Sequence, residues 1–237
     1  MPAHALHDIL QELGDAAGKA GRPGPRLLAV SKKQPATAVA ELAAAGQIEF
    51  GENYVQEALA KQTQLARISA TTHPKIDAAA LKWHLIGHLQ SNKAKEAAAL
   101  FDWVQTVDRV KLVGSLAAHR RDDQPPLNVL IQVNIDDEAS KHGCAPDEVA
   151  VLAQAIALQP RLRLRGLMVI PTPHAESERR RPAFRRSREL FERLQREHPQ
   201  VDTLSMGMSD DAAIAIAEGA TMVRIGTALF GARPAGR

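Results

Sequence analysis

A lysine follows an apolar run at the point where the chain turns, in the segment Leu27–Pro35. The four apolar residues Leu27–Val30 are typical of a strand buried on both faces, and Pro35 ends the extended stretch. Lys32 is therefore predicted at the carboxyl end of a buried strand, where barrels and open parallel sheets keep their chemistry. An amine partly removed from water there can act as a nucleophile toward an aldehyde. These residues alone leave a second interpretation open, a strand-end lysine that extends to solvent.

An arginine interrupts a second apolar segment, Met222–Ile225. If Arg224 faces outward between helices, it forms an ordinary exterior salt bridge. If it faces inward, it needs a partner, and it supplies a permanent donor to a carboxylate or a ring nitrogen. A pyridine nitrogen beside this fixed positive charge stays unprotonated.

Two glycine-containing loops follow the last two predicted strands, Gly207-Met208-Ser209 and Ile225-Gly226-Thr227. Glycine lets a backbone N–H approach an anion closely, and the hydroxyl groups add donors. Barrel enzymes often hold a phosphate at the loops after strands seven and eight, although simple turn chemistry is the alternative for each loop. Ser209 is predicted as the N-cap of the next helix, whose amino end would face the same place. The acidic pair Asp210-Asp211 weakens a phosphate site unless it points away.

Short β-rich runs alternate with Ala-rich helical patterns, and these elements must position the residues above. Strands are predicted over Leu27–Ser31, Ile48–Glu52, Trp83–Gly87, Trp103–Val107, Val129–Asn134, Leu164–Ile170, Thr203–Met208 and Met222–Ile225. Helices are predicted over Thr37–Ala45, Tyr54–Ala66, Ser91–Leu100, Val110–His119, Pro146–Leu158, Pro182–Glu197 and Asp210–Glu218, with an extra N-terminal helix within residues 1–20. Eight strands separated by helices are the count of a (β/α)8 TIM-type barrel, and a doubly wound open sheet is the alternative. Because no linker interrupts the chain, we expect one domain over residues 1–237 with a tail at residues 231–237.

The composition is that of an ordinary globular protein, with 45% hydrophobic and 24% charged residues in 237. No apolar run approaches the roughly 18 residues that span a bilayer, and Met1–Gly18 lacks the pattern of an export signal. The single cysteine, Cys144, excludes an internal disulfide and fits a reducing cytoplasm. The arginines of Arg179–Arg188 accompany an apolar stripe typical of a helix face, and only 3% of the residues are aromatic. We therefore expect neither membrane nor nucleic-acid binding.

Other residue constellations do not form sites on this reasoning. His84 and His88 would suit a metal on a helix, but on a strand they lie about 13 Å apart. We expect His84 at the barrel mouth, His88 in a loop and no metal site. Cys144 is interpreted as an inert surface thiol. The segment Gly207–Asp211 lacks the second glycine of a nucleophile elbow, which argues against a hydrolase.

Five segments in order resemble one family over nearly the whole chain: Ala29–Lys32, Phe50–Glu57, Trp83–Lys93, Leu204–Ser209 and Val223–Thr227. The chain is similar to the pyridoxal-phosphate homeostasis protein family, also described as alanine-racemase-like or proline-synthase-associated proteins. The resemblance implies a single-domain barrel like the N-terminal domain of alanine racemase, of fold type III among pyridoxal-phosphate proteins. It also implies that the chain binds pyridoxal 5'-phosphate.

The resemblance implies roles for residues at matching positions. Lys32 is implied to carry the internal aldimine, and Arg224 to face the pyridine nitrogen. The implied phosphate ligands are Ser209, Gly226 and Thr227, and the implied pocket residues are Asn53, Ser205 and Met206. Lys141 matches a family lysine linked to cofactor transfer. Gln34 stands where many relatives have a second lysine, and the tail lacks the terminal lysines of some relatives, so exchange through those amines is not implied.

Racemase activity is not part of what the resemblance implies. Alanine racemases use a lysine and a tyrosine on opposite faces of the cofactor, and their tyrosine comes from a second domain that this chain is expected to lack. The one tyrosine here, Tyr54, is expected to serve packing. The implied function is a non-catalytic carrier that stores and delivers the cofactor, and the alternative is a small amino-acid racemase-like enzyme on the same barrel. The implied partners are pyridoxal phosphate, related B6 vitamers and apo-enzymes that use them, and we expect a cytoplasmic monomer.

Overall fold

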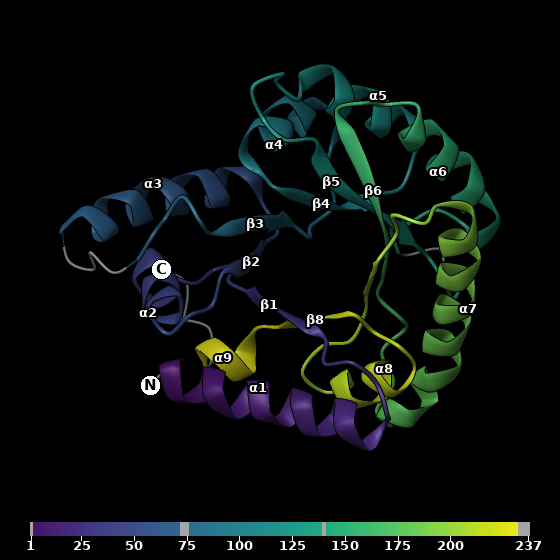
Figure 1. The fold of residues 1–237 in the computed structure, drawn as a ribbon, viewed down its shortest axis with the longest axis horizontal. Coiled ribbons are helices and arrows are strands. Elements are labelled where there is room, and N and C mark those ends of the chain that lie inside the picture. Colours follow the sequence, from purple (N-terminus) through teal and green to yellow (C-terminus); the bar gives the residue numbers. More distant parts are fainter. Residues whose placement is uncertain (1, 72–75, 139–140, 232–237) are drawn as a thin grey trace.

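Eight parallel strands pair in chain order and close into a barrel, in which β8 lies beside β1 (Figure 1). The structure is a computed structural model and describes residues 2–71, 76–138 and 141–231. The strands are β1 (Arg26–Val30), β2 (Glu49–Glu52), β3 (Lys82–Leu85), β4 (Trp103–Val107), β5 (Leu127–Val133), β6 (Leu162–Val169), β7 (Thr203–Ser205) and β8 (Met222–Ile225).

Helices surround the barrel and connect its strands (Figure 1). The α-helices are α1 (Pro2–Lys19), α2 (Ala36–Ala44), α3 (Val55–Thr71), α4 (Ala94–Leu100), α5 (Val110–His119), α6 (Val149–Ala157), α7 (Arg181–Glu197), α8 (Ala212–Ala217) and α9 (Thr227–Phe230). Short 3₁₀ turns precede three of them: η1 (Ser91–Lys93), η2 (Pro146–Glu148) and η3 (Ser177–Arg180). Helix α1 packs across α8 and α9, beneath the strands that close the barrel.

The predicted (β/α)8 barrel is confirmed, and the open sheet is wrong. The residue pairs Leu28↔Arg224 and Ala29↔Ile225 join the first and last strands, which an open sheet would leave apart. The predicted bounds of β4, α5 and β8 agree with the structure. That residues 1–237 form one domain stays a prediction, and residues 232–237 of the predicted tail lie outside the described residues.

The segment after β7 differs from the prediction. The predicted strand continues to Met208, but β7 ends at Ser205, and Gly207 adopts a left-handed backbone with φ of 92°. A Cβ at this position would lie 2.6 Å from the Cβ of Ala215, so only glycine fits here. The chain therefore leaves the sheet early, and the Gly207 carbonyl accepts a hydrogen bond from the Arg224 backbone N–H at 3.0 Å.

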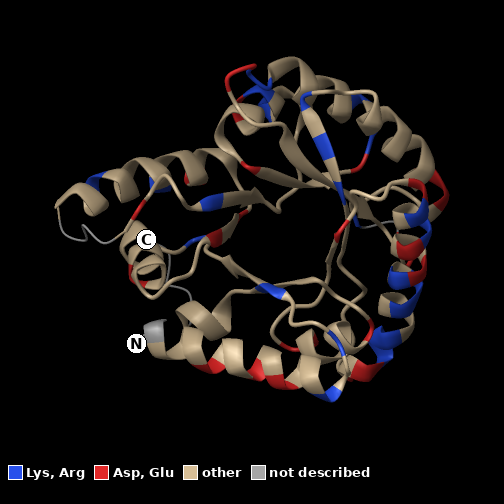
Figure 2. Ribbon diagram, viewed as in Figure 1, with Lys and Arg blue, Asp and Glu red and all other residues tan. Residues whose placement is uncertain are grey.

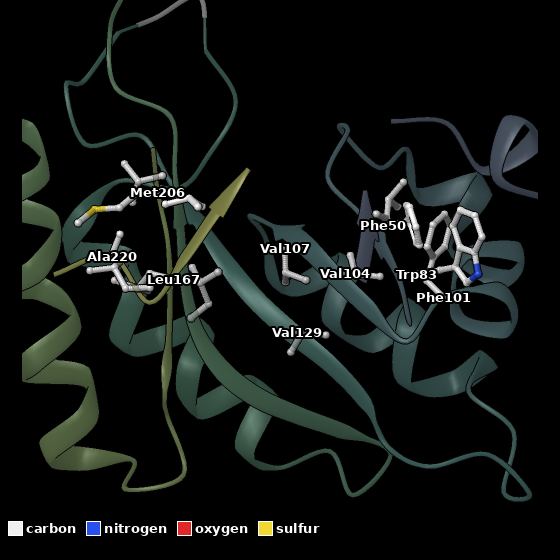
Figure 3. Packing of buried hydrophobic residues seen from close by; sticks show 14 of the residues in the cluster. Phe50, Trp83, Phe101, Val104, Val107, Val129, Leu167, Met206 and Ala220 are labelled. Carbon is white, nitrogen blue, oxygen red and sulfur yellow. The ribbon is translucent and has the colours of Figure 1, made fainter. Parts of the chain in front are cut away.

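Strand residues alternate between the barrel interior and the layer beneath the helices. Val104, Val129 and Leu167 belong to the large core between strands and helices, part of which Figure 3 shows. Trp103 and Leu130 belong to a separate buried cluster. This alternation sets which residues of the strand ends can face the mouth.

The arginine-rich helix α7 carries both signs of charge (Figure 2). Its apolar residues, among them Phe184 and Leu190, are buried. On the polar side, Arg181 and Arg188 contact Glu218, a buried carboxylate, at 3.1 and 3.4 Å. None of the helices that the structure describes is both long and apolar enough to cross a membrane.

Candidate functional site at the carboxyl end of the barrel

Lys32 lies two residues after the end of β1, at the carboxyl end of the barrel, and is partly exposed. Its backbone neighbours are fixed on both sides. The Ser31 N–H donates to the Gly51 carbonyl at 3.0 Å, and the Gln34 N–H donates to the Ser31 carbonyl at 3.0 Å. Lys33 takes a left-handed backbone with φ of 61°, and its N–H donates to the Glu57 carboxylate. The turn that carries Lys32 is therefore held in one shape.

A buried ion pair lies beneath this turn. Glu52 is fully buried at the end of β2, and Lys61 of α3 is 4% exposed. The Lys61 Nζ donates to Glu52 Oε1 at 2.5 Å and to the Ser31 carbonyl at 2.7 Å, and the Ser31 hydroxyl donates to the same Oε1 at 2.5 Å. Burial raises the pKa of the Glu52 carboxyl, and Lys61 and Ser31 oppose the rise. Glu52 Oε2 is buried with no hydrogen-bond partner among the described residues.

Lys61 was not identified from the sequence. Its signal was present, because Val55, Ala58, Lys61 and Leu65 share the buried face of α3. A lysine in the middle of such a face requires a carboxylate partner. Ion pairing with Glu52 supplies that partner and ties α3 to the Lys32 turn.

Arg224 faces inward and is 4% exposed. Its Nη1 donates to the Ser205 carbonyl at 2.8 Å and hydroxyl at 2.9 Å, and its Nη2 donates to the Val169 carbonyl at 2.9 Å. The exterior salt-bridge alternative is therefore wrong. Burial lowers the pKa of the guanidinium to about 10, with Asp211 opposing, so it stays protonated at neutral pH.

A chain of buried polar groups continues from Arg224 into the barrel. The Ser205 hydroxyl donates to Gln105 Oε1 at 2.8 Å, and Gln105 Nε2 lies 3.0 Å from His84 Nδ1. The His84 ring is fully buried and stacks on Trp103 with 5.1 Å between ring centroids. Its burial lowers the pKa of His84 well below the ordinary value, so the ring is neutral. The prediction of His84 at the mouth was wrong, because the ring points into the barrel beside the first residue of β4.

The predicted phosphate residues lie in the loops that follow the neighbouring strands β7 and β8. Gly226 directly precedes α9, and Thr227, the first residue of that helix, is exposed. Ser209 is exposed in the turn after β7. Their three positions give backbone and hydroxyl donors at the loops after β7 and β8.

The predicted N-cap at Ser209 was wrong. Helix α8 starts at Ala212 with Asp211 as its N-cap, and Asp211 Oδ1 accepts from the Met208 N–H at 2.6 Å. Its other oxygen pairs with Arg180 Nη1 at 2.6 Å, and Asp211 is buried. The Asp211 carboxylate makes no capping hydrogen bond to the helix, and Arg180 and the Met208 N–H hold it instead. The ion pair with Arg180 also offsets the negative charge of Asp211, which would otherwise weaken the binding of a phosphate nearby.

The remaining predicted pocket residues differ in their exposure to solvent. Asn53 is partly exposed after β2 and lines a cavity of about 450 Å³ together with Tyr54, His88 and Lys93. Tyr54 is 60% exposed, so the prediction that it serves packing was wrong. Met206 is fully buried in the core between strands and helices, as Figure 3 shows, and does not open to the mouth.

Lys141 lies in the loop after β5 and reaches toward the loop after β6. Its Nζ lies 2.9 Å from Glu138 Oε2 and 3.3 Å from Thr172 Oγ1. It therefore occupies the carboxyl rim, paired with a carboxylate. Cys144, nearby in the chain, is buried, and burial raises the pKa of its thiol to about 12. The surface position predicted for Cys144 was wrong, because the thiol is buried away from solvent.

Comparisons with known proteins identify the family. The chain matches the family model for the alanine racemase N-terminal domain over residues 5–234. It is 50% identical to the pyridoxal phosphate homeostasis protein of Pseudomonas aeruginosa, over 99% of this chain and 96% of the relative. It is 48% identical to the protein of that name from Escherichia coli K12, over 98% and 96%.

Solved structures agree with the fold. PipY of Synechococcus elongatus, solved without and with bound PLP, is 35% identical and gives TM-scores of 0.84 and 0.80, each over 98% of this chain and 100% of that one. Alanine racemase from Corynebacterium glutamicum is 19% identical, with a TM-score of 0.66 over 61% of its chain, and shares the fold alone. The chain thus belongs to the pyridoxal phosphate homeostasis protein family, within the wider family of alanine racemase N-terminal domains.

Proposed function

We propose that this protein binds pyridoxal 5'-phosphate, with Lys32 as its covalent attachment point, and serves intracellular homeostasis of the cofactor by storing and delivering it. The observation that carries the proposal is the pairing of β1 with β8. These neighbouring strands bring an amine and a buried guanidinium to the same end of the barrel, since Arg224 pairs with Leu28, four residues before Lys32 in the chain.

The residues around the mouth fit the chemical groups of this cofactor. The Lys32 amine suits its aldehyde, and the Arg224 guanidinium suits an unprotonated ring nitrogen. Donors for a phosphate come from Ser209, Gly226 and Thr227 at the loops after β7 and β8. Asn53 lines the pocket from β2.

Ser205 and Met206 act from behind the pocket in this proposal. The buried Ser205 accepts a hydrogen bond from Arg224 and donates one to Gln105, so it fixes the guanidinium. Met206 fills the core beneath the same strand end. Lys141 stands on the rim, where its amine can meet a cofactor that enters or leaves.

A carrier function without catalysis accounts for these residues. When bound, the cofactor supplies an aldehyde and an aromatic ring that acts as an electron sink. A fixed guanidinium at the ring nitrogen disfavours the pyridinium form and so weakens that sink. Tyr54 is exposed at the rim rather than held in place as a base. We further propose that the ligands include related B6 vitamers, that apo-enzymes receive the cofactor, and that the protein is a cytoplasmic monomer.

Covalent trapping tests the attachment point. The protein is incubated with pyridoxal 5'-phosphate, reduced with borohydride and digested, and mass spectrometry locates the modified peptide. We expect the modification on Lys32, and its loss with the visible absorbance band in Lys32→Ala. The matched control is Lys33→Asn, because asparagine tolerates the left-handed backbone at that position. Modification of a different lysine in the wild type, or none, would overturn the assignment.

Amino-acid turnover tests the carrier function separately. The loaded protein is incubated with L-alanine and other amino acids, and chiral chromatography measures the opposite enantiomer. We expect none above the level given by free cofactor. Turnover that disappears in Lys32→Ala would instead favour the racemase-like alternative.

A further inference from the structure

Two histidines and an aspartate meet at the carboxyl rim, beyond the ends of three consecutive strands. His88 follows β3, Asp108 follows β4, and His142 lies in the loop after β5. One ligand atom of each residue lies within 4.8 Å of the ligand atoms of the other two. From the sequence, His88 was compared only with His84 as a metal ligand, and this grouping across three loops was not predicted.

The two imidazole rings lie face to face. Their centroids are 3.8 Å apart with 14° between the ring planes, and His88 Nδ1 lies 3.8 Å from Asp108 Oδ2. Two imidazoles and one carboxylate are a donor set typical of divalent transition metals, with other coordination positions left for water. Side-chain exposure is 33% for His88 and 10% for Asp108, so an ion can reach the group from solvent.

Groups behind these residues hold them in place. Arg109 Nη1 donates to Asp108 Oδ1 at 2.5 Å, which leaves Oδ2 on the side of His88. The Thr106 hydroxyl donates to the Gly87 carbonyl, next to His88, at 2.9 Å. Such outer contacts orient ligands in metal sites. Neighbouring residues therefore hold both the Asp108 carboxylate and the backbone next to His88.

The described residues around His142 are held by contacts with β5. Gln132 Nε2, on β5, donates to the His142 carbonyl at 3.2 Å. The next residue, Gly143, has φ of 121°, and a Cβ there would lie 2.7 Å from the backbone nitrogen of Asn134. The backbone beneath the second imidazole therefore has one shape.

We propose that His88, Asp108 and His142 form a binding site for one divalent transition-metal ion, of which Zn²⁺ is the reference case. Metal–ligand bonds of about 2.0–2.1 Å place tetrahedral ligand atoms roughly 3.3 Å apart. The three donor atoms reach this spacing when the two rings tilt toward each other, which their partly exposed positions allow. None of the three ligands is among the residues proposed to hold pyridoxal phosphate, although His88 lines the same cavity as Asn53. The metal titration below is done without the cofactor, so its outcome does not depend on that function.

Metal titration tests the site. Untagged protein is treated with chelator and titrated with Co²⁺, whose visible spectrum reports coordination, and with Zn²⁺ by calorimetry. We expect one tight equivalent in the wild type and an affinity lower by at least about 100-fold in the double variant His88→Gln/His142→Gln. Asp108→Asn, which keeps both imidazoles, is expected to weaken binding less.

Two controls separate the site from weak surface binding. His119→Gln removes an exposed histidine of α5 and should leave the titration unchanged. His4 and Asp8 lie 3.8 Å apart on α1 and supply the competing two-ligand site, so His4→Gln is measured as well. Equal affinity in the wild type and the double variant, or loss of the tight equivalent in His4→Gln alone, would overturn the proposal. Circular dichroism confirms that each variant is folded.

Discussion

Removing the Lys61 amine tests the buried ion pair beneath the Lys32 turn. Lys61→Met keeps most of the side-chain volume but leaves Glu52 buried without its cation, and it removes the hydrogen bond to the Ser31 carbonyl. Breaking a buried pair from one side costs about 3–5 kcal/mol of unfolding free energy. In a chain of this size each kcal/mol shifts Tm by about 2–4 °C, so we expect a decrease of roughly 6–20 °C.

Chemical denaturation measures this change directly. Trp83 and Trp103 are buried on different strands and report unfolding by their fluorescence. The double variant Lys61→Met/Glu52→Gln should recover most of the loss, because neither charge then remains buried. Lys111→Met, at an exposed lysine of α5, should change the unfolding free energy by less than about 0.5 kcal/mol. A loss below about 1 kcal/mol in Lys61→Met, or a double variant no more stable than the single one, would refute the reasoning.

The pH dependence of the unfolding free energy gives a second test of the ion pair. The pKa of Glu52 is already raised by burial, and removal of Lys61 raises it further because the opposing cation is gone. A carboxyl with a raised pKa in the folded state binds its proton there more tightly than in the unfolded chain. The deficit of Lys61→Met relative to wild type should therefore be smallest at acidic pH and grow as the pH rises through the folded-state pKa of Glu52.

Three further predictions concern single positions. Gly207→Ala should lower the unfolding free energy measured in denaturant by about 1–3 kcal/mol, because the φ of 92° and the neighbouring atoms leave no room for a methyl group. The control Gly114→Ala, in open space on α5, should be neutral or stabilising. Arg120→Met should lower the unfolding free energy by about 2–4 kcal/mol in the same measurement, because the Arg120 guanidinium donates to three carbonyls. The control Arg121→Met, at an exposed position, should change the unfolding free energy little. Cys144 should resist a thiol reagent in folded protein at pH 8 and react promptly in denaturant, since burial raises its pKa to about 12; fast labelling of folded protein would contradict the buried position.

The barrel was predictable because its strands are short apolar runs between helical patterns. Arg224 was singled out because a charged residue inside such a run either forms an exterior salt bridge or, if it faces inward, needs a buried partner. The early end of β7 was not predictable from its residue types. Thr203–Ser205 and the residues after them are equally compatible with a strand, and the packing of Gly207 against α8 is what ends it.

The residues that were not identified from the sequence depend on contacts between elements. Lys61 lies on the buried face of α3, but its partner Glu52 is evident only once β2 and α3 are placed against each other. His88 and His142 lie in loops far apart in the chain, and only the barrel order β3, β4, β5 makes those loops neighbours. Local patterns thus predicted the elements, while the groups that strand order assembles required the closed fold.

The pairing of β1 with β8 also bears on how the protein is made. Lys32 is synthesised near the start of the chain and Arg224 near its end, about 190 residues and roughly 10–40 s later at ordinary rates of translation. Until β8 leaves the ribosome, the backbone groups of β1 that pair with it in the finished barrel stay open to water or to a chaperone. A nascent or truncated chain without β8 therefore has the amine but lacks the guanidinium and the loop of Gly226 and Thr227. Under the proposed function, capture of the cofactor therefore waits until β8 has left the ribosome and paired with β1.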